Sequence, residues 1–375
     1  MLVFLCEKYD DLVHRMKIVV LANFDVGLYK FRKALLERFL ADGHEVYIAL
    51  PNGEYVPRLV ELGCTFIETP LERRGMNPAK DISLFHLYCS IMKKVCPDLV
   101  VTYTVKPNVY GGMACRKLKI PYAANITGLG TAIEQGGALR TLVLNMYREA
   151  LKKAKVVFFE NTGNRDRLVE FGAVKAEKTH VLHGAGIETT DYPFAPYPPD
   201  GQIRFLFVGR IMREKGVDEL FSAITRLKQA YGDRVRLDLV GFNEESYEQK
   251  IEELQKDGMV RFLGFQDDVQ AFYRTAHCVV LPSYHEGMSN VLLEAGAMGR
   301  PLITSDIHGC LEAVNEGISG YLCAVRDADS LYDSMARFVE LPYAEKAKMG
   351  QASHDHVVER FDKKRVVEDT VRQLY

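Results

Sequence analysis

The chain has 375 residues, of which 47% are apolar and 26% charged, which excludes a mainly disordered, a collagen-like or a disulfide-scaffold protein. This length suits two domains, and a mean hydropathy of −0.10 with no apolar run of about 20 residues predicts no membrane-spanning helix. The net charge of −2 combines +6 over residues 1–190 with −8 over the remainder, so the first half favours an anionic neighbour. No run of like charge is long enough to indicate nucleic acid.

Short apolar runs alternate with helical patterns through the first half of the chain. Residues 1–15 lack the basic start and the small-residue cleavage site of a signal peptide, so we treat them as an N-terminal extension. A buried strand at 16–21 precedes a glycine turn at 23–27 and a helix at 28–42. Further strands are predicted at 45–50, 64–68, 99–103 and 122–126. This alternation predicts right-handed β-α-β units in a doubly wound parallel sheet.

A proline-rich segment at 192–201 interrupts this pattern. Its four prolines in ten residues suit neither a helix nor a central strand, which indicates an interdomain linker. The alternation then resumes, with strands predicted at 203–208, 235–240, 260–263, 278–281 and 301–305. The fold class is therefore predicted to be α/β, with two tandem Rossmann-like domains. Such domains leave a cleft between the carboxyl ends of their sheets, where ligands bind.

The predicted domain boundaries follow from the linker and from the end of the second alternating region. We expect an N-terminal domain over 16–195 and a C-terminal domain over 196–360. The remaining segment, 361–375, is expected to form a C-terminal helix that can pack back toward the N-terminal domain.

Neither the cysteines nor the paired acidic residues indicate a metal site. None of the eight cysteines forms a CxxC pair, and no histidine cluster has zinc-ligand spacing. This is typical of reduced core cysteines in a cytosolic protein. Asp327 and Asp329 precede a predicted helix, where we expect a helix cap rather than a metal ligand.

A first candidate anion site follows the strand at 203–208. Gly209 lets the backbone turn, and Arg210 and Lys215 come just before a helix that starts near 217. A strand end, a glycine and a helix N-terminus together favour an anion, and two cations suit a diphosphate. The alternative is a solvated loop with two surface cations, and this motif alone does not decide between them.

Two glutamates eight residues apart form a second candidate site. Glu286 lies in the loop after the strand at 278–281, and Glu294 lies in an apolar helix just over two turns further on. The amide groups of Gly287–Ser289 open this helix and are placed to receive a phosphate. The alternative makes both glutamates ordinary solvated or capping carboxylates. An unpaired carboxylate among apolar residues is costly, however, and a ribose would resolve that cost at Glu294.

In this order along the chain, the Gly-Arg-x4-Lys and Glu-x7-Glu motifs resemble the retaining glycosyltransferases of family 4, which have the GT-B fold. The resemblance covers essentially residues 16–375. It implies that Glu294 binds the ribose of a nucleotide sugar and that Glu286 contacts the sugar. Arg210 and Lys215 would hold the diphosphate and act in catalysis together with Glu286. The further donor-binding candidates are Gly27, Gly209, Gly264, Phe265, Gly287, Met288 and Ser289, with Gly264 and Phe265 lying against the base.

In the N-terminal half, segments 104–112 and 125–131 resemble a bacterial subset of this family that extends oligosaccharides on undecaprenyl diphosphate. The candidate acceptor and cleft residues are Lys106, Asn108, Thr127 and Glu134. Lys106 follows a strand end, where it either meets a phosphate or is a surface lysine before a Pro-Asn turn. Many family members place a histidine after the strand at 122–126. Here Thr127 stands in that position, so Thr127 or Glu134 would supply the hydrogen bonds to the donor sugar instead.

The resemblance implies a retaining, metal-independent hexosyltransferase. It would move a hexose or N-acetylhexosamine from UDP-GalNAc, UDP-Gal or UDP-GlcNAc to a polyprenyl-diphosphate-linked sugar in bacterial polysaccharide or glycan biosynthesis. Cationic side chains and helix N-termini would stabilise the leaving diphosphate, so no cofactor is expected. Two alternatives stay open. One is a nucleotide-sugar isomerase similar to UDP-GlcNAc 2-epimerase, and the other is a non-catalytic nucleotide-sugar-binding scaffold.

A basic helical stretch at 139–155 suggests contact with a membrane. Its five cations are Arg140, Arg148, Lys152, Lys153 and Lys155. Anionic lipid attracts such a surface at about 1 kcal/mol per residue. The alternative is a core-packed helix with one solvated face. A lipid-linked acceptor favours a cytoplasmic protein peripherally associated with an anionic membrane surface at the inner face of the cell membrane.

Overall fold

Two parallel β-sheets form the framework of the molecule, and the computed structural model describes residues 15–71, 77–129, 133 and 136–375. Within these residues, the first sheet has seven strands in the order β3-β2-β1-β4-β5-β6-β7 and the second has six in the order β10-β9-β8-β11-β12-β13. Neighbouring strands pair in parallel throughout. The predicted fold class, two tandem doubly wound α/β domains, is confirmed.

The N-terminal sheet is built from short apolar strands that are covered on both faces. Its strands are β1 (Lys17–Leu21), β2 (Glu45–Leu50), β3 (Thr65–Glu68), β4 (Leu99–Tyr103), β5 (Tyr122–Ile126), β6 (Val156–Phe159) and β7 (Thr179–Val181). Side chains alternate across β1, so Ile18 and Val20 enter one hydrophobic core while Val19 and Leu21 enter the other. Burial on both faces explains why these strands are continuous apolar runs.

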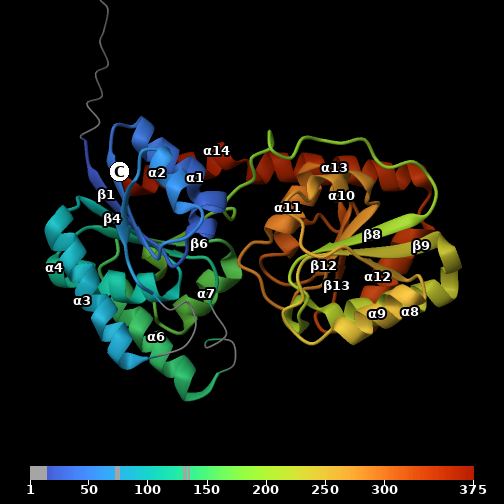
Figure 1. Ribbon diagram of the computed structural model, residues 1–375, viewed down its shortest axis with the longest axis horizontal. Coiled ribbons are helices and arrows are strands. Elements are labelled where there is room, and N and C mark those ends of the chain that lie inside the picture. Colours follow the sequence, from blue (N-terminus) through green and yellow to red (C-terminus); the bar gives the residue numbers. More distant parts are fainter. Residues whose placement is uncertain (1–14, 72–76, 130–132, 134–135) are drawn as a thin grey trace, which may run out of the picture.

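Helices cover the two faces of this sheet unequally (Figure 1). One core contains side chains of α1 (Asp25–Ala41) and α2 (Val56–Glu61). The other contains side chains of α3 (Pro78–Val95), α4 (Gly112–Leu118), α6 (Gly137–Leu151) and α7 (Thr162–Glu170). A π-helical turn, Pro107–Gly111, joins β4 to α4.

The C-terminal domain repeats this architecture around a single large core. Its strands are β8 (Ile203–Val208), β9 (Val235–Val240), β10 (Val260–Phe262), β11 (Cys278–Leu281), β12 (Leu302–Ser305) and β13 (Gly320–Cys323). Its helices are α8 (Val217–Tyr231), α9 (Glu248–Lys256), α10 (Gln270–Thr275), α11 (Asn290–Ala297), α12 (Ala328–Glu340) and α13 (Tyr343–Phe361). In Figure 1, α8, α9 and α12 lie on one side of the sheet and α10, α11 and α13 on the other.

Several element boundaries differ from the predicted ones. Helix α1 begins at Asp25 rather than at 28, because Gly27 lies within the first helical turn instead of in a preceding loop. Strands β6, β7 and β13 were not predicted from the sequence, although β6 is a buried apolar run. β7 and β13 are short and lie at the ends of their sheet orders, where the apolar pattern is weakest.

The chain crosses between the domains twice, and the two crossings pair with each other. Ile187 forms a parallel bridge with Asp362. The Ile187 amide donates to the Phe361 carbonyl at 2.7 Å, and the Lys363 amide donates to the Ile187 carbonyl at 3.1 Å. Gly186, with φ of +70°, permits this approach, because a Cβ atom there would lie 2.7 Å from the Cα atom of Lys363.

The linker is fixed to the C-terminal domain by a fully buried arginine. The Arg300 guanidinium donates to the carbonyls of Ala195 and Pro196 in the linker and to that of Met298. Burial lowers the pKa of Arg300 to about 10. These carbonyl contacts compensate for the removal of the cation from water.

The second crossing ends in α14 (Lys363–Leu374), which packs on the N-terminal domain. Val366, Val371 and Leu374 enter the same core as Ile18 and Val20. The His180 Nε2 and Asp369 Oδ2 atoms lie 2.8 Å apart. The Lys155 ammonium donates to the Leu374 carbonyl at 2.6 Å. Phe361, in contrast, belongs to the core of the C-terminal domain. The N-terminal domain is therefore built from two separate stretches of chain.

Substitution of Leu374 tests whether α14 completes the N-terminal core. We expect Leu374→Ala to lower the free energy of unfolding of the N-terminal domain by roughly 2–4 kcal/mol, because it opens a cavity in a packed core. Chemical denaturation measures this change. It can be followed by circular dichroism and by tyrosine fluorescence, because the protein contains no tryptophan. Arg372→Ala on the exposed face of α14 is the matched control. Equal stability of the two variants would contradict this role of α14.

Candidate active site

The two sheets face each other with the carboxyl ends of their strands, which is the edge where parallel sheets bind ligands. In the first sheet the strand order reverses between β1 and β4, and in the second between β8 and β11. Ligands bind in the crevice that such a reversal leaves at the carboxyl ends of the strands. The loops after these four strands line two cavities between the domains.

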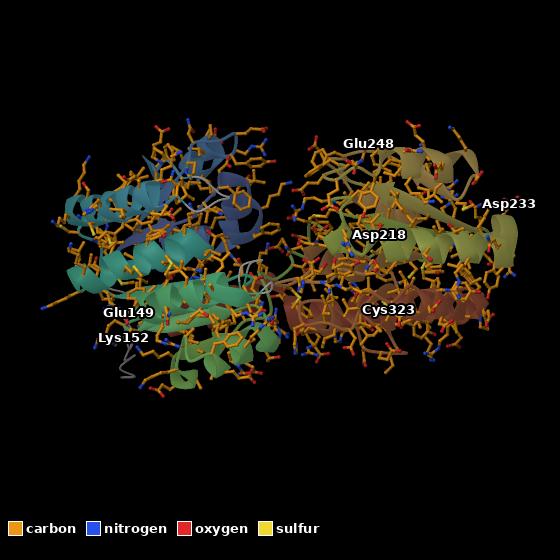
Figure 2. All side chains as sticks on the ribbon, turned by 90° about the horizontal axis from the view of Figure 1, so that it is seen from below. Glu149, Lys152, Asp218, Asp233, Glu248 and Cys323 are labelled. Atoms are coloured by element: carbon orange, nitrogen blue, oxygen red, sulfur yellow. The ribbon has the colours of Figure 1, made fainter. Side chains whose placement is uncertain are left out.

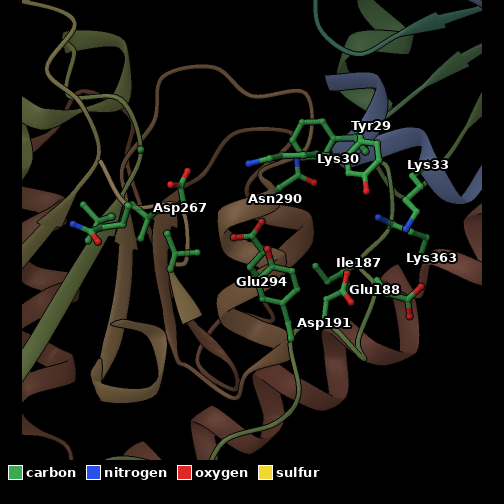
Figure 3. A pocket seen from close by; sticks show the side chains of 18 of the residues that line it. Tyr29, Lys30, Lys33, Ile187, Glu188, Asp191, Asp267, Asn290, Glu294 and Lys363 are labelled. Atoms are coloured by element: carbon green, nitrogen blue, oxygen red, sulfur yellow. The ribbon is translucent and has the colours of Figure 1, made fainter. Parts of the chain in front are cut away.

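The large cavity has a volume of about 740 Å³ and is lined by both domains. From the C-terminal domain come the ends of β8 and β9 and the α11 side chains Asn290 and Glu294. Figure 3 shows Glu294 in the middle of this cavity, with Tyr29, Lys30 and Lys33 from α1 reaching in from the N-terminal domain. This volume lies in the range that small ligands and cofactors occupy.

The small cavity has a volume of about 260 Å³ and adjoins the large one. Phe31 and Asn290 line both cavities. The walls of the small cavity carry polar side chains that come from strand ends or from α1 of the N-terminal domain and from the loop before α11. These are Asn23, Arg32, Tyr103, Thr104, Thr127, Glu160 and Glu286.

Glu294 is a half-buried carboxylate held by two tyrosines. The Tyr273 hydroxyl donates to Glu294 Oε2 at 2.9 Å, and Tyr192 forms a second hydrogen bond with the same side chain. Burial raises the pKa of Glu294, and these hydrogen bonds together with Lys30 and Lys363 only partly offset the effect. The carboxylate is therefore oriented by the protein and keeps acceptor capacity for hydroxyl groups in the cavity.

The two predicted phosphate-binding cations, Arg210 and Lys215, each form an ion pair with a glutamate. The Lys215 ammonium forms an ion pair with Glu286, and the Ser283 hydroxyl donates to the same Glu286 oxygen at 2.8 Å. Arg210 lines the large cavity and forms an ion pair with Glu244. The structure therefore brings Lys215 and Glu286 together directly and places Arg210 at the wall of the large cavity.

The loop 287–289 fits closely between the domains. A Cβ atom on Gly287 would lie 1.9 Å from the Thr127 carbonyl oxygen, so only glycine is compatible with this contact. The Gly287 carbonyl accepts a hydrogen bond from Asn161, and the Met288 side chain is buried in the core of the C-terminal domain. Ser289 caps α11, but its amide already donates to the Gly309 carbonyl at 2.8 Å. The expectation that the Ser289 amide faces a phosphate is therefore wrong.

Exposed aromatic rings mark one end of the large cavity. Phe265 is 60% exposed and Phe242 47% exposed, and their ring centroids lie 6.3 Å apart. Both line the large cavity, and such rings offer a planar apolar surface to a base. Gly264 lies at φ of +66° beside them, but its carbonyl accepts the Gly241 amide and it does not itself line the cavity.

The remaining predicted glycines lie at the two cavities. Gly209 directly follows β8 and lines the large cavity. Its amide donates to the Val240 carbonyl at 2.9 Å. Gly27 lines the small cavity from the first turn of α1. Phe24, which precedes that helix, supplies no side-chain cap.

The acceptor candidates Lys106 and Asn108 do not line either cavity, which corrects their predicted placement. The Lys106 ammonium lies 2.9 Å from Asp81 of α3. Asn108 is buried, where it accepts from the Thr102 hydroxyl at 2.6 Å and donates to the Asn125 carbonyl at 2.8 Å. The π-helical turn draws both side chains into the domain. Thr127 does line the small cavity, and Glu134 lies outside the described residues.

Sequence analysis missed several charged residues at the cavities, and three of them have pKa values that are shifted there. Arg32 of α1 forms an ion pair with Glu160, the residue that follows β6. Burial alone would lower the pKa of Arg32, but Glu160 and Tyr103 outweigh it and raise that pKa. Lys363 enters the large cavity from α14 (Figure 3), and burial lowers its pKa. No local motif marks these residues: Glu160 follows a strand and Lys363 begins a helix, whereas Arg32 lies in the middle of α1.

The described residues contain no group of three or more histidine, cysteine, aspartate or glutamate side chains arranged to hold a metal ion. Asp327 accepts from the amides of Asp329 and Ser330 and so caps α12, as the sequence predicts. Of the seven described cysteines, all but Cys96 are buried and none is in a disulfide. The six buried cysteines belong to the hydrophobic cores rather than to the cavities.

Comparison with known proteins agrees with this geometry. The family model described as glycosyl transferases group 1 matches residues 189–356, and the model described as glycosyl transferase 4-like matches residues 17–161. The N,N'-diacetylbacillosaminyl-diphospho-undecaprenol alpha-1,3-N-acetylgalactosaminyltransferase of Campylobacter jejuni is 27% identical over 87% of this chain and 90% of that protein. The putative glycosyltransferase EpsD of Bacillus subtilis is 23% identical over 94% of each chain.

Solved structures share the arrangement of the two domains. Anabaena Alr3699/HepE in complex with UDP and glucose superposes with a TM-score of 0.77 at 17% identity, over 96% of this chain and 99% of that one. The lipopolysaccharide outer core galactosyltransferase WaaB superposes with a TM-score of 0.71 at 18% identity, over 96% and 99%. These likenesses establish the fold. Because the two family models between them match both domains, the chain belongs to the family 4-type glycosyl transferases with the GT-B fold.

Proposed function

We propose that this protein is a retaining glycosyltransferase that moves a hexose or N-acetylhexosamine from a UDP-sugar to a polyprenyl-diphosphate-linked sugar. One observation carries the proposal. Glu294 and Glu286, eight residues apart, face two adjoining cavities at the point where the strand order of both sheets reverses. A nucleotide sugar spans two such cavities naturally, because it joins a nucleotide to a monosaccharide.

Different side chains of the two cavities suit different parts of the donor. Phe265 and Phe242 offer a surface for the base, and the oriented Glu294 carboxylate accepts from the ribose hydroxyls. Arg210 lines the large cavity and Lys215 is paired with Glu286, which lines the small one, so the two cations suit a diphosphate. The small cavity then holds the sugar, with Glu286 at its wall. The solved neighbour in complex with UDP and glucose agrees with a UDP-sugar as the donor.

Catalysis in this arrangement consists of stabilising the leaving group. As the bond between the sugar and the diphosphate breaks, negative charge grows on the diphosphate, and Arg210 and Lys215 stabilise it. The acceptor hydroxyl attacks from the face that the diphosphate leaves, forming the new glycosidic bond, and a leaving-group oxygen takes its proton. We propose that these cations make a metal or other cofactor unnecessary.

The acceptor is proposed from the relatives rather than from the cavities. The Campylobacter relative is named for transfer to a sugar on diphospho-undecaprenol, which suits a role in polysaccharide, capsule or lipid-linked oligosaccharide biosynthesis. A nucleotide-sugar isomerase would turn over its donor without an acceptor. A non-catalytic scaffold would bind the donor without turnover. Neither alternative is favoured by the family membership.

A donor screen tests the proposed reaction. We expect release of UDP from one of UDP-GalNAc, UDP-Gal, UDP-GlcNAc and UDP-Glc, with GDP-mannose inactive, only when a lipid-diphosphate-sugar extract is present. Glu286→Gln should lower kcat by about a hundredfold or more, because it removes a charged group at the reacting sugar. Nucleotide release assayed by a coupled enzyme measures both effects.

The control for this screen is Glu248→Ala, a change to an exposed glutamate on α9 that Figure 2 shows on the outer face of the same domain. It should retain full activity. Turnover without acceptor would indicate the isomerase, and UDP-sugar binding without turnover under any acceptor would indicate the scaffold.

Glu294 carries a cost in stability that its proposed role explains. Its pKa is raised by burial, so the native state binds a proton at this carboxyl more tightly than the unfolded state does. A group with a raised carboxyl pKa stabilises the fold at acid pH and loses that contribution as the pH rises through the folded pKa. A protein that needed this position only for packing would be more stable with a neutral residue there.

We therefore expect Glu294→Gln to raise Tm at pH 7 while weakening UDP binding at least tenfold, since a charged acceptor of the ribose hydroxyls is lost. The gain in Tm should shrink as the pH falls toward 4.5, the ordinary value from which the pKa of Glu294 is raised. Calorimetric melting at a series of pH values, with UDP titration at pH 7, measures both. A constant or reversed difference in Tm would refute the electrostatic account.

Peripheral membrane association is proposed for the face formed by α3, α4 and α6. A surface groove of about 510 Å³ lies there, lined by the apolar side chains Ile82, Phe85 and Met113 and by Tyr110, Lys117 and the ion pair of Arg116 with Glu149. None of the helices in the described part of the chain is long and apolar enough to cross a bilayer. Apolar side chains rimmed by cations suit the surface of an anionic membrane and a polyprenyl diphosphate.

The basic stretch at 139–155 contributes less to this face than predicted. Helix α6 ends at Leu151, and its buried side chains pack into the core of the N-terminal domain. Arg140, Arg148 and Lys155 donate to backbone carbonyls of Ile133, Gly172 and Leu374 respectively. Lys152, labelled beside Glu149 in Figure 2, and its neighbour Lys153 are exposed and remain candidates for contact with lipid.

Vesicle binding tests this face. The protein should pellet with vesicles that contain 30% anionic phospholipid at low salt, a composition chosen to be roughly that of an anionic leaflet, and should dissociate as salt rises. Lys152→Glu/Lys153→Glu should weaken binding by about tenfold or more. Lys250→Glu/Lys256→Glu on α9 changes the net charge equally and should have little effect. Equal recovery in the supernatant with and without vesicles would refute the proposal.

A further inference from the structure

The small cavity contains a buried ion pair that the proposed reaction has not yet used. Arg32 of α1 and Glu160 after β6 both line this cavity, and their side chains are only 12% and 13% exposed. The Arg32 guanidinium also lies over the Tyr103 ring, 5.0 Å from its centroid. The pair joins residues 128 positions apart and fixes them at one wall.

This pair keeps unused hydrogen-bonding capacity. One nitrogen of Arg32, Nη2, donates to one oxygen of Glu160, Oε1. Within the described residues, neither side chain forms a further hydrogen bond. A buried carboxylate has acceptor sites on both oxygens, and a guanidinium has five N–H donors. Taking two such charges out of water is costly unless the remaining sites are also satisfied.

A neighbouring side chain points to the same conclusion independently. The Asn23 Oδ1 atom is buried without a hydrogen-bond partner, and Asn23 lines the same cavity. This wall therefore presents the unpartnered Asn23 oxygen and the unused hydrogen-bonding sites of Arg32 and Glu160 to a space of about 260 Å³. Burial raises the pKa of Glu160, with Arg32 only partly offsetting the effect, which agrees with an incompletely satisfied carboxylate.

The position of Glu160 indicates which sugar the pair meets. A Cβ atom on Gly287 would lie 2.9 Å from Glu160 Oε2, so the second carboxylate oxygen lies beside the loop that carries Glu286. Because Phe31 and Asn290 line both cavities, a nucleotide in the large cavity extends its sugar into the small one. The sugar in contact with this wall is then the donor sugar.

We propose that Arg32 and Glu160 form a specificity-determining pair that recognises two adjacent polar groups of the donor sugar. The Glu160 carboxylate accepts from a sugar hydroxyl, and the Arg32 guanidinium donates to a neighbouring hydroxyl or to the carbonyl of an acetamido group. Asn23 Oδ1 accepts from a further hydroxyl. This inference rests on the proposed function and names the residues that read the sugar.

Binding without acceptor tests the pair. Titration calorimetry would compare UDP with UDP-GalNAc, UDP-GlcNAc, UDP-Gal and UDP-Glc on the wild type, on Glu160→Gln and on Arg32→Gln/Glu160→Gln. The double variant keeps two amides that hydrogen-bond each other and leaves no unpaired buried charge. We expect both variants to lose about tenfold or more in affinity for the preferred UDP-sugar, while affinity for UDP changes by about twofold or less.

Asp81→Asn is the matched control, because it breaks the ion pair with Lys106, which is comparably buried in the same domain but lines neither cavity. It should leave both affinities unchanged. Melting curves identify any variant that fails to fold, and the double variant then carries the test.

Three outcomes would overturn the proposal. Affinities for UDP and UDP-sugar that fall together would show that the pair only holds the domains in place. If Glu160→Gln and the double variant bind UDP-sugars as tightly as Asp81→Asn does, the pair does not contact the donor sugar. The same conclusion holds if these variants change only the KM for the acceptor. A wild-type protein that binds no UDP would refute the proposed function and this inference with it.

Discussion

The geometry of the site depends on the backbone pairing of the two crossings between the domains. Ile187 lies between Phe361 and Lys363 in a short parallel bridge, and Gly186 permits the close approach. Because both crossings are bound to each other, the two sheets are held with their carboxyl edges facing. The Asn161 side chain and the Gly287 carbonyl join the domains a second time at the cleft. These two attachments hold α1 and α11 at the same cleft.

The buried charges of the cleft lie where this attachment removes water. Glu294, Glu160 and Lys363 have pKa values shifted by burial toward their neutral forms, and all three line the interdomain cavities. Strongly shifted groups in a cleft are typical of functional sites, whereas the exposed ion pairs on the outer helices contribute little to stability. The cleft also contains a residue with a strained backbone. Thr104, a β-branched residue at the end of β4, lies at φ of +72° and lines the small cavity.

The sequence predicted those features of the fold and site that local pattern determines. Apolar runs gave the central strands, and the combination of Glu294 with an apolar helix indicated a carboxylate that needs a polar partner. The placement of Lys106 and Asn108 was wrong, because a π-helical turn and the distant Asp81 decide where these side chains lie. Arg32 and Glu160 could not be found, since only the folded sheet brings α1 and the end of β6 together. Lys363 was missed for the same reason, because it reaches the cavity through the second crossing.

Helix α14 also ties the order of synthesis to the order of folding. The first strands of the N-terminal domain leave the ribosome long before Val366, Val371 and Leu374, yet these side chains share one core with Ile18 and Val20. Domains generally fold as units during synthesis, with the N-terminal one first. The part of this core that α14 covers therefore stays exposed until residues 366–374 have been translated.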